Sequence, residues 1–197
     1  MRAYPRKDPR PGVSSVLSPE LKRRAGGRDI RIVFDEATIA ARVRRLGQEI
    51  TAAYPEGDLL VLGLLKGSVI FLSDLGRQID RPLHLDFVVA ASYGAGTVSS
   101  GNVRLVYDPE TPLEGKHLLI VEDIIDSGRT MKQMLTLLAA RRPASLAVCA
   151  LLDKNLLPVP IPEVRWVGFP APPAFLVGYG LDHAEDYRHL PFIGDLT

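Results

Sequence analysis

The residues best able to do chemistry are gathered in one stretch near the middle of the chain. Four apolar residues at 118–121 lead into carboxylates, hydroxyls and a glycine turn, at Glu122, Asp123, Asp126, Ser127, Gly128, Arg129 and Thr130. A turn of small residues at the start of a helix presents free backbone N–H groups to an anion. The hydroxyls of Ser127 and Thr130 add further donors. The pattern therefore predicts a cradle suited to a phosphate monoester.

The carboxylates in this stretch need a different ligand, because they would repel a phosphate. Sugar hydroxyls or a hydrated cation are better partners for Glu122 and Asp123, so the whole stretch indicates a ribose 5-phosphate site. The plainer alternative is that Asp126 and Thr130 cap a helix while the acidic pair is solvated at a strand end. That alternative explains three carboxylates within five residues, followed by Ser-Gly-Arg-Thr, less well. The stretch is not a Walker A loop, since no Gly-Lys-Ser/Thr follows a glycine at the required spacing.

Strands and helices that alternate along the chain must position these residues. Apolar residues at helical spacing follow Asp35, a suitable N-cap, and the run at 59–65 has the continuous apolar character of a strand buried on both faces. We expect further strands at 83–90, 103–107, 118–121 and 146–152, and further helices at 68–79 and 131–140. This order predicts an α/β fold with a mainly parallel, twisted sheet flanked by helices. Ligands bind such sheets at the carboxyl ends of the strands.

Residues 92–101, which begin with Ser92 and Tyr93, are expected to form a flexible loop. These ten residues are mostly small or polar and include three glycines. They are too poor in apolar side chains to enter a core and too few to separate two domains.

The net charge of +1 is distributed unevenly. Residues 1–28 hold eight Arg and Lys against two acidic residues, a net of +6, which leaves −5 for residues 29–197. Because the first segment contains four prolines and almost no apolar periodicity, we expect 1–28 to be a flexible extension and 29–197 to be the folded domain. An arm that binds nucleic acid or another anionic surface is the alternative, and an organelle transit peptide is a third.

Composition excludes several classes of protein. Hydrophobic residues make up 46% and charged residues 24% of the chain, the balance of a globular protein rather than of a disordered chain, a coiled coil or a fibre. The longest apolar runs are far shorter than the roughly 20 residues of a membrane helix, so no membrane partner is expected. The single cysteine, Cys149, cannot form an internal disulfide, and no signal-peptide pattern is visible. We therefore expect a cytoplasmic protein.

Residues 121–130, Val-Glu-Asp-Ile-Ile-Asp-Ser-Gly-Arg-Thr, resemble the motif that binds 5-phosphoribosyl 1-diphosphate (PRPP) in type I phosphoribosyltransferases. More narrowly, residues 29–197 resemble the hypoxanthine phosphoribosyltransferases. Four further segments carry this likeness, in order: Leu65-Lys-Gly-Ser68, Ser92-Tyr-Gly94 through Gly101, Leu151-Leu-Asp-Lys154, and Val177-Gly-Tyr-Gly-Leu-Asp182 continuing to Tyr187-Arg188.

The resemblance implies the type I phosphoribosyltransferase fold, with a small base-binding hood, and an enzyme of purine salvage. Such an enzyme transfers the 5-phosphoribosyl group of PRPP to N9 of hypoxanthine, and of guanine. The products are IMP or GMP and diphosphate, and Mg²⁺ is the cofactor. A homodimer or homotetramer is implied as well. The alternative from another class is a PRPP-sensing regulator of the same fold that binds nucleic acid, for which the basic segment gives a motive. A nucleic-acid partner is otherwise not expected.

The resemblance also implies a role for each matching residue on the sugar side. Glu122 and Asp123 lie against the ribose 2′ and 3′ hydroxyls and, with Asp182, at the metal. Asp126 is the general acid or base beside the purine N7, because the purine must lose a proton as N9 attacks C1′. The loop that holds the 5′-phosphate consists of Asp126, Ser127, Gly128, Arg129 and Thr130.

The remaining matches concern the diphosphate, the base and the flexible loop. The diphosphate contacts are Lys66, Gly67 and Arg188. The purine contacts are Lys154 at the 6-oxo oxygen, Phe175 stacked on the ring, Leu176 through its backbone, and Asp182 near the base. The loop with Ser92 and Tyr93 is expected to close over the site. Two segments, 155–160 and 171–174, depart from the family pattern near the expected base pocket.

Overall fold

A computed structural model describes residues 17–92 and 103–196 of the chain. The helices are α1 (Pro19–Arg24), α2 (Glu36–Ala53), α3 (Val69–Gly76) and α4 (Arg129–Ala139). The strands are β1 (Arg31–Phe34), β2 (Leu59–Leu65), β3 (His84–Ser92), β4 (Val103–Tyr107), β5 (His117–Ile125), β6 (Ser145–Asp153), β7 (Val164–Pro170), β8 (Leu176–Val177) and β9 (Ile193–Asp195).

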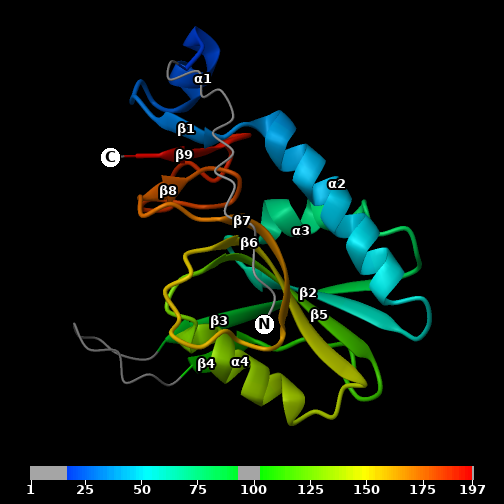
Figure 1. Cartoon of the computed structure of the whole chain (residues 1–197). Helices are drawn as coiled ribbons and strands as arrows, with labels where there is room; N and C mark the ends of the chain where they lie inside the picture. The colour runs from blue at the N-terminus through cyan, green and yellow to red at the C-terminus, as the bar shows by residue number, and fades with distance from the viewer. Residues whose placement is uncertain (1–16, 93–102, 197) are drawn as a thin grey trace.

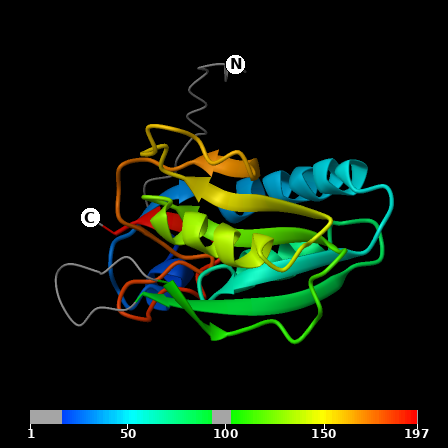
Figure 2. The same ribbon diagram turned by 90° about the horizontal axis from the view of Figure 1, so that it is seen from below.

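The larger sheet has six strands in the order β4-β3-β2-β5-β6-β7. Each neighbouring pair from β3 to β7 is parallel, and only the edge strand β4 runs antiparallel to β3. Figure 2 shows this order across the sheet, from green β3 and β4 at one edge to orange β7 at the other. The expected α/β fold with a mainly parallel sheet is therefore confirmed.

Alternate residues of the central strands pack in two separate cores, because successive side chains of a strand point to opposite faces. Leu59 and Val61 pack with α2 and α3, whereas Leu60, Leu62 and Leu64 pack with α4. Figure 1 shows α2 and α3 on one side of the sheet and α4 on the other. Burial on both faces explains the unbroken apolar run of β2, where six of the seven residues are buried.

Helix α2 forms where its sequence pattern predicts it. The Asp35 side chain accepts a hydrogen bond of 2.7 Å from the Thr38 N–H. Hydrogen bonds from the side chain and the backbone of Thr38 hold the pKa of this carboxyl below its ordinary value. Ile39, Val43 and Leu46 lie on the buried face of the helix. Helix α3 is shorter than expected and ends at Gly76. None of the helices in the described residues is long and apolar enough to cross a membrane.

The smaller sheet, in the order β1-β9-β8, forms a hood above the carboxyl ends of the larger sheet (Figure 1). The hood joins residues from both ends of the chain, since β1 pairs with β9 antiparallel, Arg31 opposite Asp195. A third core fills it, made of Leu17, Ala25, Ile30, Val177, Tyr187, Leu190 and Phe192.

The hood includes part of the segment 1–28 that we expect to be a flexible extension. Leu17 and Ala25 are buried in its core, and helix α1 lies between them, with Ser18 as its N-cap. The Arg24 guanidinium also donates a hydrogen bond of 2.8 Å to the His189 carbonyl. The described part of residues 1–28 is therefore folded onto the domain. Residues 1–16 lie outside the described residues, and so does the expected loop at 92–101 apart from Ser92, so their flexibility stays a prediction.

Strand β5 extends beyond the expected residues 118–121 because its pairing with β6 continues past the acidic pair. Glu122 pairs with Ala150, and Ile125 pairs with Asp153. Both acids therefore lie within a central strand, held by a parallel ladder, rather than in the turn that follows it.

The packing of residues 17–28 against the hood predicts a stability effect. Ala25 has no exposed surface, so Ala25→Asp would bury a carboxylate in an apolar core. We expect a loss of at least about 1–3 kcal/mol in the free energy of unfolding. For a chain of this size, each kcal/mol lowers Tm by about 2–4 °C. Thermal unfolding followed by circular dichroism measures this, and Arg23→Gln, on the exposed side of α1, changes the charge equally and should leave Tm within about 2 °C. Equal Tm values for wild type and Ala25→Asp would mean that residues 17–28 do not pack on the hood.

Candidate active site

Three segments that are far apart in sequence meet in direct contact at the carboxyl end of the sheet. A Cβ atom at Gly67, just after β2, would overlap the Asp123 carboxylate of β5. A Cβ atom at Gly180, in the hood, would overlap the Gly67 carbonyl oxygen. The backbone of Gly180, at φ 100°, also favours glycine. The end of β2, the end of β5 and the hood therefore approach one another at a distance that only glycine permits.

The predicted phosphate loop lies between β5 and α4. Gly128 is the N-cap of α4 in a left-handed conformation, with φ 63°, and Ser127, Arg129 and Thr130 are exposed beside it. The first N–H groups of a helix have no intrahelical acceptor, so they are available to an anion at this point. The loop is closed from behind by Leu157, whose methyl groups would lie 2.8 and 2.9 Å from a Cβ atom at Gly128.

The acidic pair is held in an environment that disfavours its charge. Burial raises the pKa of Glu122 well above its ordinary value, and the neighbouring Asp123 raises it further. The Glu122 Oε2 atom is buried without a hydrogen-bond partner among the described residues. Burial also raises the pKa of Asp123. Hydrogen bonds from backbone N–H groups, including one of 2.9 Å from Ile124, and the charge of Arg188 oppose that shift.

The structure brings Lys154 and Asp126 together from the ends of neighbouring strands. The Lys154 ammonium lies 2.8 Å from Asp126 Oδ2, next to the phosphate loop. A backbone hydrogen bond links the same two segments, because the Lys154 N–H donates to the Ile125 carbonyl at 3.0 Å. A cationic donor and a carboxylate that can accept a proton are thus in direct contact.

Two more of the predicted base contacts lie at the start of the hood. Phe175 is half-exposed, and Leu176 is buried on β8. The Phe175 ring packs edge-on against His183, with the ring centres 5.2 Å apart. Sequence reasoning missed His183, which follows Asp182 in a segment that already resembled the family.

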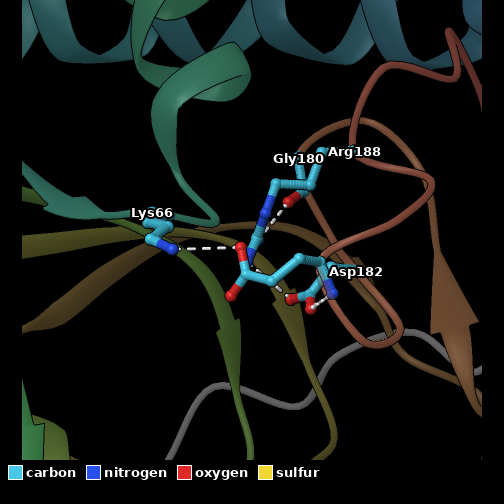
Figure 3. Close-up of polar contacts among 5 residues, drawn as sticks. Lys66, Gly180, Asp182 and Arg188 are labelled. Carbon is cyan, nitrogen blue, oxygen red and sulfur yellow. Dashed lines mark hydrogen bonds and ion pairs between the residues drawn. The ribbon is translucent and has the colours of Figure 1, made fainter.

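The predicted diphosphate contacts Lys66 and Arg188 face each other across the site (Figure 3). Lys66 follows a cis peptide bond. The Arg188 guanidinium donates to the Gly180 carbonyl at 2.8 Å and lies 2.9 Å from Asp182 Oδ1. Both cations also contact Glu185, another residue that sequence reasoning missed. Its hydrogen bonds with Lys66 and Arg188 lower the pKa of Glu185.

The donors at the acidic pair fit Mg²⁺. Glu122 and Asp123 supply hard carboxylate oxygens, and the Glu122 Oε2 atom has no protein partner in the described part of the chain. No group of three or more Asp, Glu, His or Cys side chains in that part could hold a metal by itself. This is compatible with Mg²⁺, which keeps several waters and binds through one or two carboxylates together with substrate phosphates. Asp182 lies in contact with Arg188 instead.

Comparisons with known proteins place the chain among close relatives. The phosphoribosyl transferase domain model matches residues 31–184. The chain is 44% identical over 171 residues to the hypoxanthine phosphoribosyltransferase of Salmonella typhimurium, covering 85% of this chain and 96% of that protein. It is 48% identical over 170 residues to the hypoxanthine-guanine phosphoribosyltransferase of Dictyostelium discoideum, covering 84% and 94%. A hypoxanthine phosphoribosyltransferase structure from Staphylococcus aureus superposes with a TM-score of 0.80 at 41% identity, covering 85% and 91%.

The Glu122 Oε2 atom is buried without a hydrogen-bond partner among the described residues, which predicts a gain in stability when the charge of Glu122 is removed. Since folding raises the pKa of Glu122, the charge does not destabilise the fold below the ordinary pKa of about 4.3 and destabilises it increasingly as the pH rises toward the raised value. At pH 7.5, without Mg²⁺, we expect Glu122→Gln to increase the free energy of unfolding by about 1–3 kcal/mol. The gain should vanish near pH 4.

Thermal unfolding across this pH range measures the effect, with the exposed Glu56→Gln as the matched control. Equal stability of Glu122→Gln and wild type at pH 7.5 would show that Glu122 is well solvated or paired in the folded protein.

Proposed function

Because the chain belongs to the phosphoribosyltransferase family, we propose that it transfers the 5-phosphoribosyl group of PRPP to N9 of hypoxanthine, and of guanine. The products are IMP or GMP and diphosphate, in a Mg²⁺-dependent reaction of purine salvage. The resemblance found in the sequence is confirmed by relatives named hypoxanthine and hypoxanthine-guanine phosphoribosyltransferase at 44% and 48% identity. Because these relatives are named as enzymes, the comparison favours a catalytic role for this chain over that of a nucleic-acid-binding regulator.

The observation that carries the proposal is the contact of 2.8 Å between Lys154 and Asp126, directly beside the phosphate loop. A lysine donor suits the 6-oxo oxygen of hypoxanthine or guanine and disfavours adenine, whose 6-amino group cannot accept a hydrogen bond. The carboxylate beside it suits the proton that the purine loses during the attack. Base recognition and proton transfer are thus supported by one pair of side chains.

The remaining residues divide the handling of PRPP among them. The loop at 126–130, at the start of α4, holds the 5′-phosphate. Glu122 and Asp123 accept hydrogen bonds from the ribose hydroxyls and stabilise positive charge that develops on the sugar. Lys66 and Arg188 hold the diphosphate. Mg²⁺ bound at the acidic pair would neutralise the negative charge of the diphosphate as it leaves.

Assembly and location form part of the proposal. A homodimer or homotetramer is proposed because the resemblance implies one, and Val69 and Ile70 at the start of α3, each 37% exposed, are apolar side chains available to such an interface. The one cysteine, Cys149, is buried and unpaired, as suits a protein of the reducing cytoplasm.

The role of Asp126 predicts a selective loss of turnover. Asp126→Asn keeps the size of the side chain but cannot accept the purine proton, so we expect the chemical step to slow by about 10²–10⁴-fold while PRPP still binds. Single-turnover kinetics with PRPP, Mg²⁺ and hypoxanthine measure the step. The control is Asp108→Asn, which breaks only an ion pair with Arg141 and should keep full activity. An unchanged single-turnover rate in Asp126→Asn would exclude Asp126 as the acid or base.

The proposed role of Lys154 predicts that its substitution affects recognition of the base and leaves the binding of PRPP nearly unchanged. Lys154→Met removes the charged donor, which should lower kcat/KM for hypoxanthine and guanine by about 10–150-fold, with nearly unchanged PRPP affinity. Glu122→Gln should instead weaken turnover of every base alike. Spectrophotometric assays with hypoxanthine, guanine, xanthine and adenine make the comparison, with Lys116→Met, at the other end of β5, as control. Wild-type turnover of both oxopurines by Lys154→Met would refute this base pocket.

A further inference from the structure

One carboxylate of the hood lies against both cations that the proposed function assigns to the diphosphate. Glu185 Oε2 is 3.0 Å from the Lys66 ammonium and 3.4 Å from the Arg188 guanidinium. Figure 3 shows Lys66 and Arg188 reaching toward this contact from opposite sides of the site. A single oxygen thus bridges two positive charges whose residues lie on separate segments, Lys66 after β2 and Arg188 in the hood.

The backbone of the hood directs Glu185 to this place. Glu185 has a left-handed conformation, with φ 69°, and so does Ala184, with φ 52°. Such conformations are uncommon for residues other than glycine. The turn is held by the Asp182 carboxylate, which accepts the Glu185 N–H at 2.9 Å, and by paired backbone hydrogen bonds between His183 and Asp186. The position of Glu185 is therefore set by the turn and not by the ion pair alone.

The ion pairs themselves are easily exchanged. The side chains of Lys66 and Glu185 are 67% and 65% exposed, and exposed ion pairs contribute little to stability. A diphosphate brings several negative charges to the same cations, and it would meet repulsion from Glu185 and from Asp182, which also contacts Arg188. A bound diphosphate would therefore compete with Glu185 for the two cations.

We propose that Glu185 is an internal anion that takes the place of diphosphate in the free protein and leaves when PRPP binds. The inference rests on the proposed function, since it needs Lys66 and Arg188 to bind diphosphate. Glu185 then weakens the binding of PRPP, and its return to the two cations favours release of the diphosphate product. It sets affinity at this subsite without touching the reacting atoms.

Glu185→Gln tests the proposal, because it keeps the length of the side chain and removes its charge. Calorimetric titration with Mg²⁺-diphosphate, and separately with Mg²⁺-PRPP, should give dissociation constants about 3–10-fold lower than for wild type at low ionic strength. The KM for PRPP should fall with them. The gain should shrink at high salt, because salt screens the exposed pairs.

Two further variants isolate the mechanism. Asp186→Asn removes the same charge one position away and should leave the affinity nearly unchanged, which separates direct competition from the general field of the hood. In a Lys66→Met background, Glu185→Gln should give a smaller gain, because one of the two contacts is already absent.

The outcomes distinguish the inference from the function beneath it. Unchanged or weaker diphosphate binding by Glu185→Gln, or an equal gain from Asp186→Asn, overturns the role of Glu185 while the transferase activity stands. If wild type binds neither PRPP nor diphosphate, both the proposed function and this inference fail.

Discussion

The close approach of Gly67 to Asp123 and to Gly180 is the constraint on which the site depends. Neither glycine has room for a Cβ atom, because the Asp123 carboxylate and the Gly67 carbonyl occupy those positions. This contact fixes the hood against the ends of β2 and β5. It thereby places Lys66, just before Gly67, and Arg188, bonded to the Gly180 carbonyl, beside the acidic pair. The larger sheet alone would carry the acids and Lys66, which follows β2, without Arg188 opposite them.

Within this frame, opposite charges of the site are held against one another. Lys154 contacts Asp126, and Arg188 contacts Asp182, so these groups are already paired before any ligand arrives. Ligand binding therefore exchanges one partner for another, which costs less than removing an isolated charge from water. Glu122 is the exception, because its buried Oε2 atom has no partner in the described residues. The unfavourable electrostatics of the site are thus concentrated at Glu122, where the proposed function would place a metal and sugar hydroxyls as the missing partners.

The sequence predicts those parts of the fold that follow from a local period, and it fails where distant segments decide. The buried run of β2 and the apolar face of α2 are visible as patterns, and both are confirmed. The continuation of β5 through Glu122 is not visible, because it comes from pairing with β6. Residues 17–28 show almost no apolar period in the sequence, because Leu17, Leu21 and Ala25 are too few to define one. They pack in a core built largely from the last part of the chain. Glu185 carries no signal beyond its place in a resembling segment, because a lone acid in a turn is usually solvated.

Leu157 shows how a segment that departs from the family pattern can still serve the site. The stretch 155–160 was expected near the base pocket, yet the Leu157 side chain fills the space behind Gly128 and packs with the core beneath α4. Two constraints therefore favour glycine at position 128. One is the left-handed backbone conformation, and the other is the close approach of the Leu157 methyl groups. An apolar contact from behind holds the loop without competing for its N–H groups, which remain available to an anion. The departure thus bears on the loop at Gly128, while Lys154 and Phe175, the proposed base contacts, lie at the end of β6 and the start of the hood.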